Sequence, residues 1–361
     1  MKILYGVCAN GRGHLTRSTV VIRHLIRSGN DVRISTSGSG IDYMNRRFPK
    51  RVYPILGRSL VVGNNRIKPV ATVIKNAAST LLFGTANNMQ LANVFVGFHP
   101  DLVITDFDPW SAQYAAMFDL PLYTVDNNHA ATMLEHDEAL TQFDPGAYRN
   151  VQIITTLIAP IADHHFVMSF FPARVTNART SLHAPIVREE IAAMIPEQRD
   201  HVLVYSTMHP ATILDAVWGV GPVRVYGAKG VDTPTERSGV QFFPTSETAF
   251  NEDLRTCRAI IAGAGFSLIT EALALGKPML AIPIGGHFEQ MMNAYYLEKL
   301  GLGARSTELT RHAVHTFLSD LSSYKPTTVA AALPNDMIQA IDRAIAAAPL
   351  VPKQIDYGRM Q

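Results

Sequence analysis

The stretch from Cys257 to Leu302 constrains the fold more than any other part of the sequence. A short apolar strand pattern, a Gly-Ala-Gly turn and a helical pattern are followed by a stop signal, a second apolar strand and a second helical pattern. These segments cover residues 258–262, 263–265, 266–275, 276–278, 279–283 and 289–300. The order predicts an α/β fold that contains a βαβα unit, with a glycine turn at the start of one helix.

Several side chains in this stretch suit a phosphorylated ligand. Backbone amides at a helix N-terminus bind anions, so the turn predicts a pyrophosphate site. A carboxylate one or two turns further along accepts two hydroxyl protons and therefore suits a ribose diol. An ordinary βαβ unit whose glycines only allow tight packing is the alternative. The candidates are Gly263, Ala264, Gly265 and Phe266 for the pyrophosphate, Glu271 for the ribose, and Glu289 and Gln290 for an attached sugar.

The order of glycine turn, Glu, Gly-x-Pro, strand, acidic-Gln, Asn-Ala and Leu-Gly resembles the donor-binding signature of nucleotide-sugar glycosyltransferases. These include the UDP-glycosyltransferases and the lipid-linked N-acetylglucosaminyltransferase of peptidoglycan synthesis. The resemblance implies two Rossmann-like doubly wound domains that face a central cleft, the GT-B fold. The second domain would bind the donor, expected to be a UDP-sugar. Many plant and animal members carry a phosphate-contacting His where this chain has Gly263, so its phosphate site would rely on backbone amides.

The length of 361 residues suits two domains of ordinary size. The strand pattern restarts near residue 201, after a segment rich in Pro, Asn and Ser that resembles the interdomain linker of the family. The C-terminal helix of that family crosses back to the first domain. We therefore predict an acceptor-binding domain over 1–172, a linker over 173–200, a donor-binding domain over 201–334, and a helix and tail over 335–361 that return toward the first domain. Within the first domain, 163–170 is predicted as the last strand.

Composition adds a location and a charge pattern. Two cysteines in apolar contexts fit reduced thiols better than a disulfide or metal site, so we expect a cytoplasmic protein. Residues 1–100 hold 14 basic against 2 acidic residues, a net +12, whereas residues 101–200 carry −9 and the remainder −1. The basic segment suits peripheral contact with an anionic membrane face or an anionic acceptor. Pairing with the acidic second segment is the alternative, and no nucleic-acid module accompanies the charge.

A strand pattern over residues 2–9 leads through Asn10-Gly11-Arg12-Gly13 into a helix that begins near His14. The third glycine of the dinucleotide fingerprint is absent, which argues against a nicotinamide or flavin cofactor. Histidine titrates near neutral pH, so His14 suits a general base for an acceptor hydroxyl, and inverting relatives place a His near this loop. The alternative for His14 is a loop or capping residue. Arg17 is a candidate acceptor contact or a solvated residue, and Gly13 a candidate donor contact.

Other candidates lie at predicted strand ends. Asp106 follows a buried strand and, as in some relatives, could orient the His14 ring. Together with Asp108 it reads D-x-D, a metal-binding pattern that we interpret as coincidental in a two-domain chain, and we expect no metal and no cofactor. His129 is a candidate acceptor contact. In the second domain Ser206 and Thr207 are candidates for the donor phosphates or for helix capping, and Phe243 for the nucleotide base or the core.

These features predict a hexosyl- or N-acetylhexosaminyl-type transferase that moves a sugar from a nucleotide-sugar to a hydroxyl, with His14 as base. Inversion of configuration is implied by the resemblance alone. Two alternatives stay open at this point: a non-hydrolysing nucleotide-sugar epimerase, and a nucleotide-sugar-binding protein without turnover.

Overall fold

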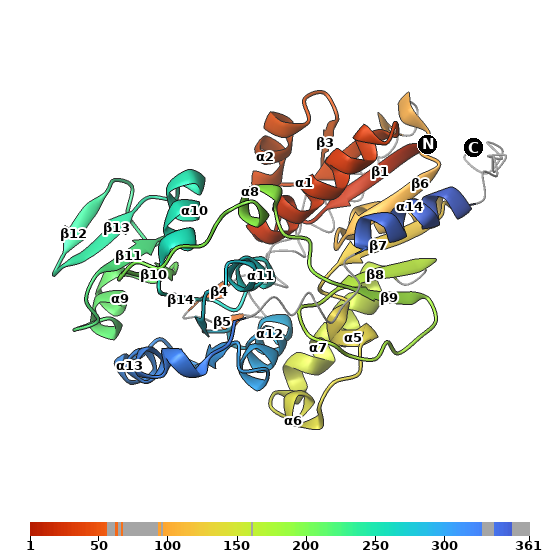
Figure 1. Ribbon diagram of the computed structural model, residues 1–361. Helices are drawn as coiled ribbons and strands as arrows, with labels where there is room; N and C mark the ends of the chain where they lie inside the picture. The colour runs from red at the N-terminus through yellow and green to blue at the C-terminus, as the bar shows by residue number, and fades with distance from the viewer. Residues whose placement is uncertain are drawn as a thin grey trace. The chain divides into compact units, whose positions relative to one another are not determined.

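The computed structural model describes residues 1–55, 62–63, 66–67, 93–94, 97–159, 162–326 and 336–348 (Figure 1). They form two compact units. The first comprises the described residues within Met1–Thr141 and Pro145–Ile186 together with those from 336 onward. The second comprises Gln142–Asp144 and the described part of Val187–Ala332.

The first unit is built on a seven-stranded parallel sheet, in the order β3-β2-β1-β6-β7-β8-β9. Strands β6 and β7 are buried along their whole length, as expected for a parallel sheet covered by helices on both faces. The strands are β1 Lys2–Val7, β2 Asp31–Thr36, β3 Val52–Pro54, β6 Leu102–Asp106, β7 Leu122–Asp126, β8 His164–Met168 and β9 Thr180–His183; β4 Val62–Gly63 and β5 Arg66–Ile67 form a separate antiparallel pair.

Strand β9 corrects the prediction that residues 163–170 form the last strand of this unit. It lies inside the range assigned to the linker, because a short segment of mixed polarity gives little strand signal in the sequence. The helices of the unit are α1 Arg12–Arg27, α2 Ser39–Arg47, α4 Pro109–Met117, α5 Ala130–Met133, α6 Glu138–Thr141, α7 Pro145–Ile158 and α14 Met337–Ala347.

Helix α4 approaches β1 so closely that only glycine fits at Gly6. A Cβ atom there would lie 1.9 Å from the hydroxyl oxygen of Ser111 in α4. The same face of the sheet carries an apolar core that includes Leu4, Val103 and Tyr114.

Helix α14 packs on the first unit through polar contacts as well as apolar ones. His24 Nε2 lies 3.0 and 2.9 Å from the two carboxylate oxygens of Asp342. His183 Nδ1 lies 2.8 Å from Asp336 Oδ1, and the Tyr123 hydroxyl donates to the Ala344 carbonyl at 3.1 Å. Figure 1 shows this helix, in blue, beside the strands of the first sheet.

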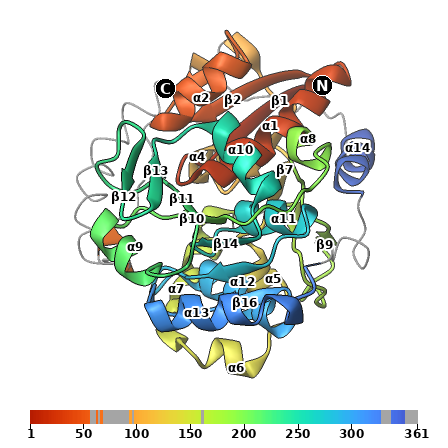
Figure 2. The ribbon, with the colours of Figure 1, turned by 60° about the vertical axis from the view of Figure 1, so that its left-hand side comes forward.

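The second unit repeats the design, with the strand order β12-β13-β11-β10-β14-β15-β16 (Figure 2). All neighbours are parallel except the edge pair β12 and β13. The strands are β10 Val202–Tyr205, β11 Val223–Tyr226, β12 Thr235–Arg237, β13 Val240–Phe243, β14 Ala259–Ala262, β15 Met279–Ala281 and β16 Gly303–Arg305. The helices are α8 Glu189–Ala192, α9 Pro210–Ala216, α10 Glu247–Thr256, α11 Phe266–Ala274, α12 Phe288–Lys299 and α13 Arg311–Ser319, followed by a 3₁₀ turn, Leu321–Ser323.

Both sheets are doubly wound, which confirms the predicted α/β class with two Rossmann-like units. The strand order reverses between β1 and β6 in the first sheet, and between β10 and β14 in the second. In open parallel sheets, ligands bind beyond the carboxyl ends of the strands at such a switch point. Asp106 pairs in register with Val7 at the first switch point, and Ala262 with Tyr205 at the second.

Candidate active site

His14 and Asp106 form a hydrogen-bonded pair at the switch point of the first unit. His14 lies in the first turn of α1, directly after β1, and Asp106 is the last residue of β6. Their Nδ1 and Oδ1 atoms lie 2.8 Å apart, with 12% of the His14 side chain exposed and none of Asp106. A histidine with one ring nitrogen on a buried carboxylate and an accessible edge has the arrangement of a general base with its orienting partner.

Arg17, one helical turn after His14, holds the other side of Asp106. Its Nε donates to Oδ2 at 2.7 Å and its Nη2 to Oδ1 at 2.6 Å, while the Ser18 hydroxyl donates to Oδ2 at 2.7 Å. Arg17 Nη1 also donates to Asn127 Oδ1. Burial alone would raise the pKa of Asp106, but the charges of Arg17 and His14 outweigh it and lower the pKa to about 2. The carboxylate therefore stays ionised.

The two contacts of His14 Nδ1 favour opposite tautomers. This atom lies 2.8 Å from Asp106 Oδ1, which can only accept, and 2.7 Å from Arg17 Nη2, which can only donate. A general base needs the tautomer with the proton on Nδ1. In that tautomer Nδ1 and Arg17 Nη2 both donate to Asp106 Oδ1, and Nε2 carries the lone pair.

Arg17 is not a solvated residue, because only 4% of it is exposed. Its guanidinium lies against Asp106 and Asn127, which bridges the ends of β6 and β7. An acceptor contact by Arg17 stays a prediction. Gly13 lies in the first turn of α1, where its carbonyl accepts from the Thr16 hydroxyl at 3.1 Å, and its donor contact stays a prediction too.

Phe107 is a site residue that the sequence reasoning did not single out. Its φ of 55° lies in the left-handed region, which is strained for an aromatic residue and is found disproportionately at functional sites. The ring stacks on His14 at 6.3 Å between centroids and meets His129 edge-on at 5.7 Å. No sequence pattern signals the left-handed conformation of a phenylalanine.

His129 lies at the end of β7, where sequence reasoning placed it, but no part of it is exposed. Its Nδ1 lies 2.7 Å from Asp126 Oδ2, and its backbone N–H donates to Oδ1 at 2.8 Å. Within the described residues, Nε2 has no hydrogen-bond partner. The acceptor contact of His129 stays a prediction, and no atom of its ring is accessible in this structure.

The two carboxylates of the D-x-D sequence have different surroundings. Asp108 is buried and caps α4, since its Oδ2 accepts from the Ser111 amide at 3.0 Å, whereas Asp106 bonds to α1. Burial raises the pKa of Asp108 to about 6. Across the part of the chain that the structure describes, no group of three His, Cys, Asp or Glu residues has the arrangement of a metal site. None of the described helices is long and apolar enough to cross a bilayer.

In the second unit, the glycine turn lies at the end of β14, beside the switch point. Gly265 is the N-cap residue of α11 and, lacking a side chain, supplies no cap. Neither Gly263 nor Gly265 has a positive φ. Among the described residues, a Cβ on Gly263 would come no closer than 3.8 Å to another atom, and one on Gly265 would have none within 4 Å. Tight packing and backbone conformation among the described residues therefore do not require glycine at these positions, and a phosphate contact at this turn stays a prediction.

Ala264 and Phe266, the other residues predicted at this turn, are buried, and Phe266 begins α11. Asn293 in α12 connects the turn to a predicted sugar contact. Its Nδ2 donates to the Ala264 carbonyl at 3.1 Å and to Glu289 Oε1 at 2.8 Å.

Gln290 has one end of its amide group fixed. Its Oε1 accepts from the Ile284 backbone N–H at 3.0 Å, which leaves Nε2 as the end directed elsewhere. The same oxygen lies 4.0 Å from the place that a Cβ on Gly263 would occupy. The structure thus brings Gln290 to the glycine turn, and its sugar contact stays a prediction.

Glu271 is paired with an arginine that the sequence reasoning had assigned only to the linker. Arg188 donates to both carboxylate oxygens of Glu271, from Nε at 2.7 Å and from Nη2 at 3.0 Å. The two positions are 83 residues apart in the sequence, so no local sequence pattern indicates this pair.

Ser206 and Thr207 follow β10 at the switch point of the second sheet. They do not cap α9, because His209 does so by accepting from the Ala211 amide at 3.3 Å. The Ser206 hydroxyl accepts from the Met208 amide at 3.2 Å. Phosphate contacts by Ser206 and Thr207 stay predictions.

Phe243 ends β13 and is half-buried. Its ring stacks on Tyr226 with centroids 5.2 Å apart, and the edge of Phe250 meets Tyr226 at 5.4 Å. A contact between Phe243 and the nucleotide base stays a prediction. The ring of Phe243 belongs to an aromatic cluster with Tyr226 and Phe250.

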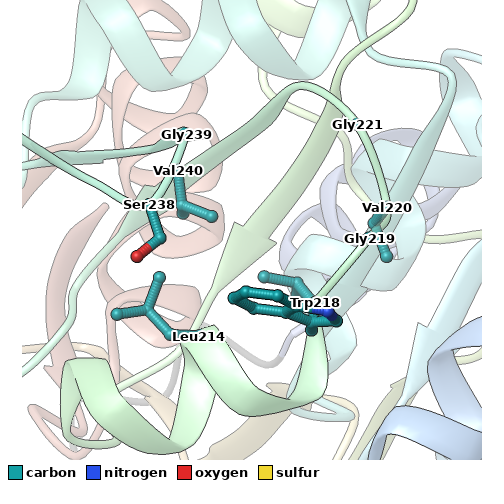
Figure 3. Close-up of a pocket in the computed structure, with 9 residues that line it drawn as sticks. Leu214, Trp218, Gly219, Val220, Gly221, Ser238, Gly239 and Val240 are labelled. Atoms are coloured by element: carbon teal, nitrogen blue, oxygen red, sulfur yellow. The ribbon is translucent and has the colours of Figure 1, made fainter.

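A cavity of about 330 Å³ lies elsewhere on the second unit (Figure 3). It is lined by Leu214, Trp218 and Val240, among others, and its loops precede β11 and β13. It therefore lies at the amino ends of these strands, opposite to the end where the glycine turn lies.

Most of the chain matches one family of known proteins. A model of the family described as Glycosyl transferase family 1 matches residues 1–322. The chain belongs to this family. It is thus a glycosyltransferase.

Two relatives are uncharacterized glycosyltransferases of Methanosarcina. That of Methanosarcina acetivorans is 23% identical over 346 residues, covering 84% of this chain and 85% of its own. That of Methanosarcina mazei is 22% identical over 347 residues, with the same coverage.

Solved structures confirm the GT-B fold of this glycosyltransferase. The glycotransferase of kitacinnamycin has a TM-score of 0.65 at 15% identity, covering 96% of this chain and 99% of the other. The Acinetobacter baumannii MurG has a TM-score of 0.58 at 13% identity, with the same coverage. At these identities the similarity concerns the fold alone.

Proposed function

We propose that this glycosyltransferase moves a sugar from a nucleotide-sugar, a UDP-sugar first among the candidates, to an acceptor hydroxyl with inversion, and that His14 is the general base. The observation that carries the proposal is the His14–Asp106 pair at the first switch point. A protein that only bound nucleotide-sugars would have no use for an accessible imidazole edge oriented by a buried carboxylate.

In the proposed reaction, His14 Nε2 takes the proton of the acceptor hydroxyl as the oxygen attacks the anomeric carbon. Asp106 stabilises the imidazolium that forms, through the Nδ1 hydrogen bond. Arg17 positions Asp106 and keeps it ionised. In the substrate complex, Nε2 must come within hydrogen-bond distance of the acceptor oxygen.

The bond between the sugar and the diphosphate breaks in the same step, so negative charge develops on the leaving nucleotide. We propose that the amides at the start of α11 and the positive end of its helix dipole stabilise this charge, without a metal ion. The open space at Gly263 and Gly265 supports a close approach of the pyrophosphate. Gln290 would donate to a sugar hydroxyl, since its carbonyl end is already bonded.

We further propose that the basic first segment contacts an anionic membrane surface or an anionic acceptor. Of the basic first segment, Arg46 and Lys50 are exposed, whereas Arg51 pairs with Asp31 at 2.8 Å. Arg58, Lys68 and Lys75 lie outside the described residues. Among the described residues of this basic segment, the exposed cations proposed for contact with an anionic membrane are thus Arg46 in α2 and Lys50 after it.

The test is a panel of nucleotide-sugars, each incubated with the protein and a mixture of hydroxyl acceptors. We expect nucleotide release that depends on acceptor, and a product whose anomeric configuration, read by NMR, is opposite to that of the donor. Interconversion of the nucleotide-sugars would indicate an epimerase, and binding without release would indicate a binding protein. Retained configuration would contradict the single displacement.

A further inference from the structure

The described residues of the second unit contain one arginine whose guanidinium is enclosed by partners on two helices. Arg188 donates to Glu271, which lies in α11. It also donates to two residues of α10, to Glu247 Oε1 at 2.9 Å and to Asn251 Oδ1 at 3.2 Å. Only 12% of the Arg188 side chain and 9% of the Glu271 side chain are exposed. A guanidinium has five N–H donors in a rigid plane, so these bonds fix its orientation.

The contact between Arg188 and Glu271 is bidentate, with one hydrogen bond to each carboxylate oxygen. Such a contact fixes the plane of the carboxylate as well as its distance. An ionised carboxylate has about four lone-pair sites, two on each oxygen. One site on each oxygen therefore remains. Because the two parallel N–H groups of Arg188 occupy the converging side of the carboxylate, the remaining sites point away from each other, and each can accept from one ribose hydroxyl.

We infer that Arg188 is a positioning residue for donor recognition: its bidentate contact holds the Glu271 carboxylate in the plane in which a remaining lone pair accepts from the ribose 2′-hydroxyl. The inference rests on the proposed donor site, since it takes Glu271 as the ribose contact. It gives Arg188 a role in selecting ribonucleotides over deoxyribonucleotides. Arg188 itself does not contact the ligand.

A purely structural role would make different predictions. As a brace between α8, α10 and α11, Arg188 would contribute to stability and would affect every ligand of the unit equally. As a positioning residue it acts through the ribose hydroxyls, so its loss would weaken ribonucleotide binding while binding of a 2′-deoxyribonucleotide would change little. The ratio of the two affinities therefore separates the roles.

The experiment measures Kd by calorimetry for UDP and 2′-deoxy-UDP, or for the corresponding pair of the nucleotide that the donor panel identifies. We expect the unmodified protein to prefer the ribonucleotide roughly 10- to 100-fold, the scale of one lost hydrogen bond to a charged group. Arg188→Gln should reduce this preference to about 3-fold or less. Arg188→Lys, which keeps the charge without the bidentate geometry, should give an intermediate value and serves if the Gln variant does not fold.

Glu247→Gln is the matched control, because it removes the charge of another partner of the same guanidinium and leaves the Glu271 contact in place. We expect it to keep the ribose preference. An unchanged preference in both Arg188 variants, with lower melting temperature or equal weakening of the two ligands, would overturn the inference. Glu271→Gln separates this failure from that of the donor site: if it retains the full ribose preference, the ribose contact itself is wrong. Because the readout is binding, it does not depend on whether transfer occurs.

Discussion

The two switch points of this glycosyltransferase differ in the groups that they present: side chains in the first unit and peptide backbone in the second. In the first unit, polar and charged side chains bond to one another: His14, Asp106, Arg17 and Ser18 form one hydrogen-bonded network. In the second unit, the turn before α11 has two glycines with open space around them and no capping side chain. The side chains of the first cluster find their hydrogen-bond partners within the cluster, whereas the glycine turn of the second has open space beside it.

This difference fits the two tasks proposed for the units. A general base needs its ring held in place before the substrate arrives, and the hydrogen bonds around His14 and Asp106 hold it. A diphosphate carries its own charges and needs donors at close range, which a bare peptide turn provides. The comparison predicts that substitutions in the first cluster change the rate, and that substitutions in the second change donor affinity.

Replacing His14 should give the largest effect. In His14→Ala the acceptor proton has no base, so kcat should fall by at least about 100-fold while donor affinity changes little. Steady-state kinetics with the donor found by the panel, together with calorimetric Kd, measure both. His24→Ala is the control, since His24 lies on the same helix and also pairs with an aspartate, Asp342. Turnover equal to the unmodified enzyme would remove His14 from the mechanism.

Replacing Gly263 should give an intermediate effect of the other kind. A Cβ there meets no atom of the described residues within 3.8 Å, so Gly263→Ala should leave the melting temperature unchanged. It should raise the Kd for the donor about 10-fold, or about 1.4 kcal/mol, by obstructing the pyrophosphate. Gly303→Ala should do the reverse, because its Cβ would lie 2.2 Å from the Met279 carbonyl and must destabilise the unit. Unaltered donor affinity in Gly263→Ala would return the turn to a packing role.

The smallest effect concerns the stability of the polar interior beside the first cluster. Burial, followed by the charge of His129, lowers the pKa of His165 to about 4. Between pH 7.5 and 6 the unfolded chain, with an ordinary pKa of about 6.5, begins to bind a proton that folded His165 excludes. Stability should therefore fall as the pH falls, by about 1 kcal/mol from this group.

His165→Gln should remove that part of the decline, so that its melting temperature falls a few degrees less than that of the unmodified protein over this range. Thermal unfolding at the two pH values measures it, with the exposed His312→Gln as control. An identical decline in the His165 variant would show that this histidine does not oppose protonation in the folded state.

Local patterns in the sequence were sufficient for much of the second unit. The strand predicted over 258–262 is β14, and the helices predicted over 266–275 and 289–300 agree with α11 and α12 to within about one residue at each end. Buried parallel strands leave uninterrupted apolar runs, and glycines mark the turns between them, so the signal is strong.

The side-chain networks could not be predicted in the same way. Arg17 and Asp106 are 89 residues apart, and the sequence does not say that a helical arginine turns inward to a strand end. The buried state of His129 and the left-handed backbone of Phe107 likewise depend on neighbours from other strands. Residue types at strand ends indicate where chemistry lies, whereas the partners of those residues are decided by tertiary structure.

The position of Arg188 has a consequence for building hybrids of this enzyme with its relatives. The first unit ends at Ile186 in this part of the chain, and Arg188 follows two residues later. A hybrid joined between Ile186 and Val187 would take Arg188 and Glu271 from the same parent. A crossover only a few residues further along would take them from different parents and could leave a buried carboxylate without its cation. Within this short segment, the choice of crossover would decide whether a recombined enzyme keeps the Arg188–Glu271 pair.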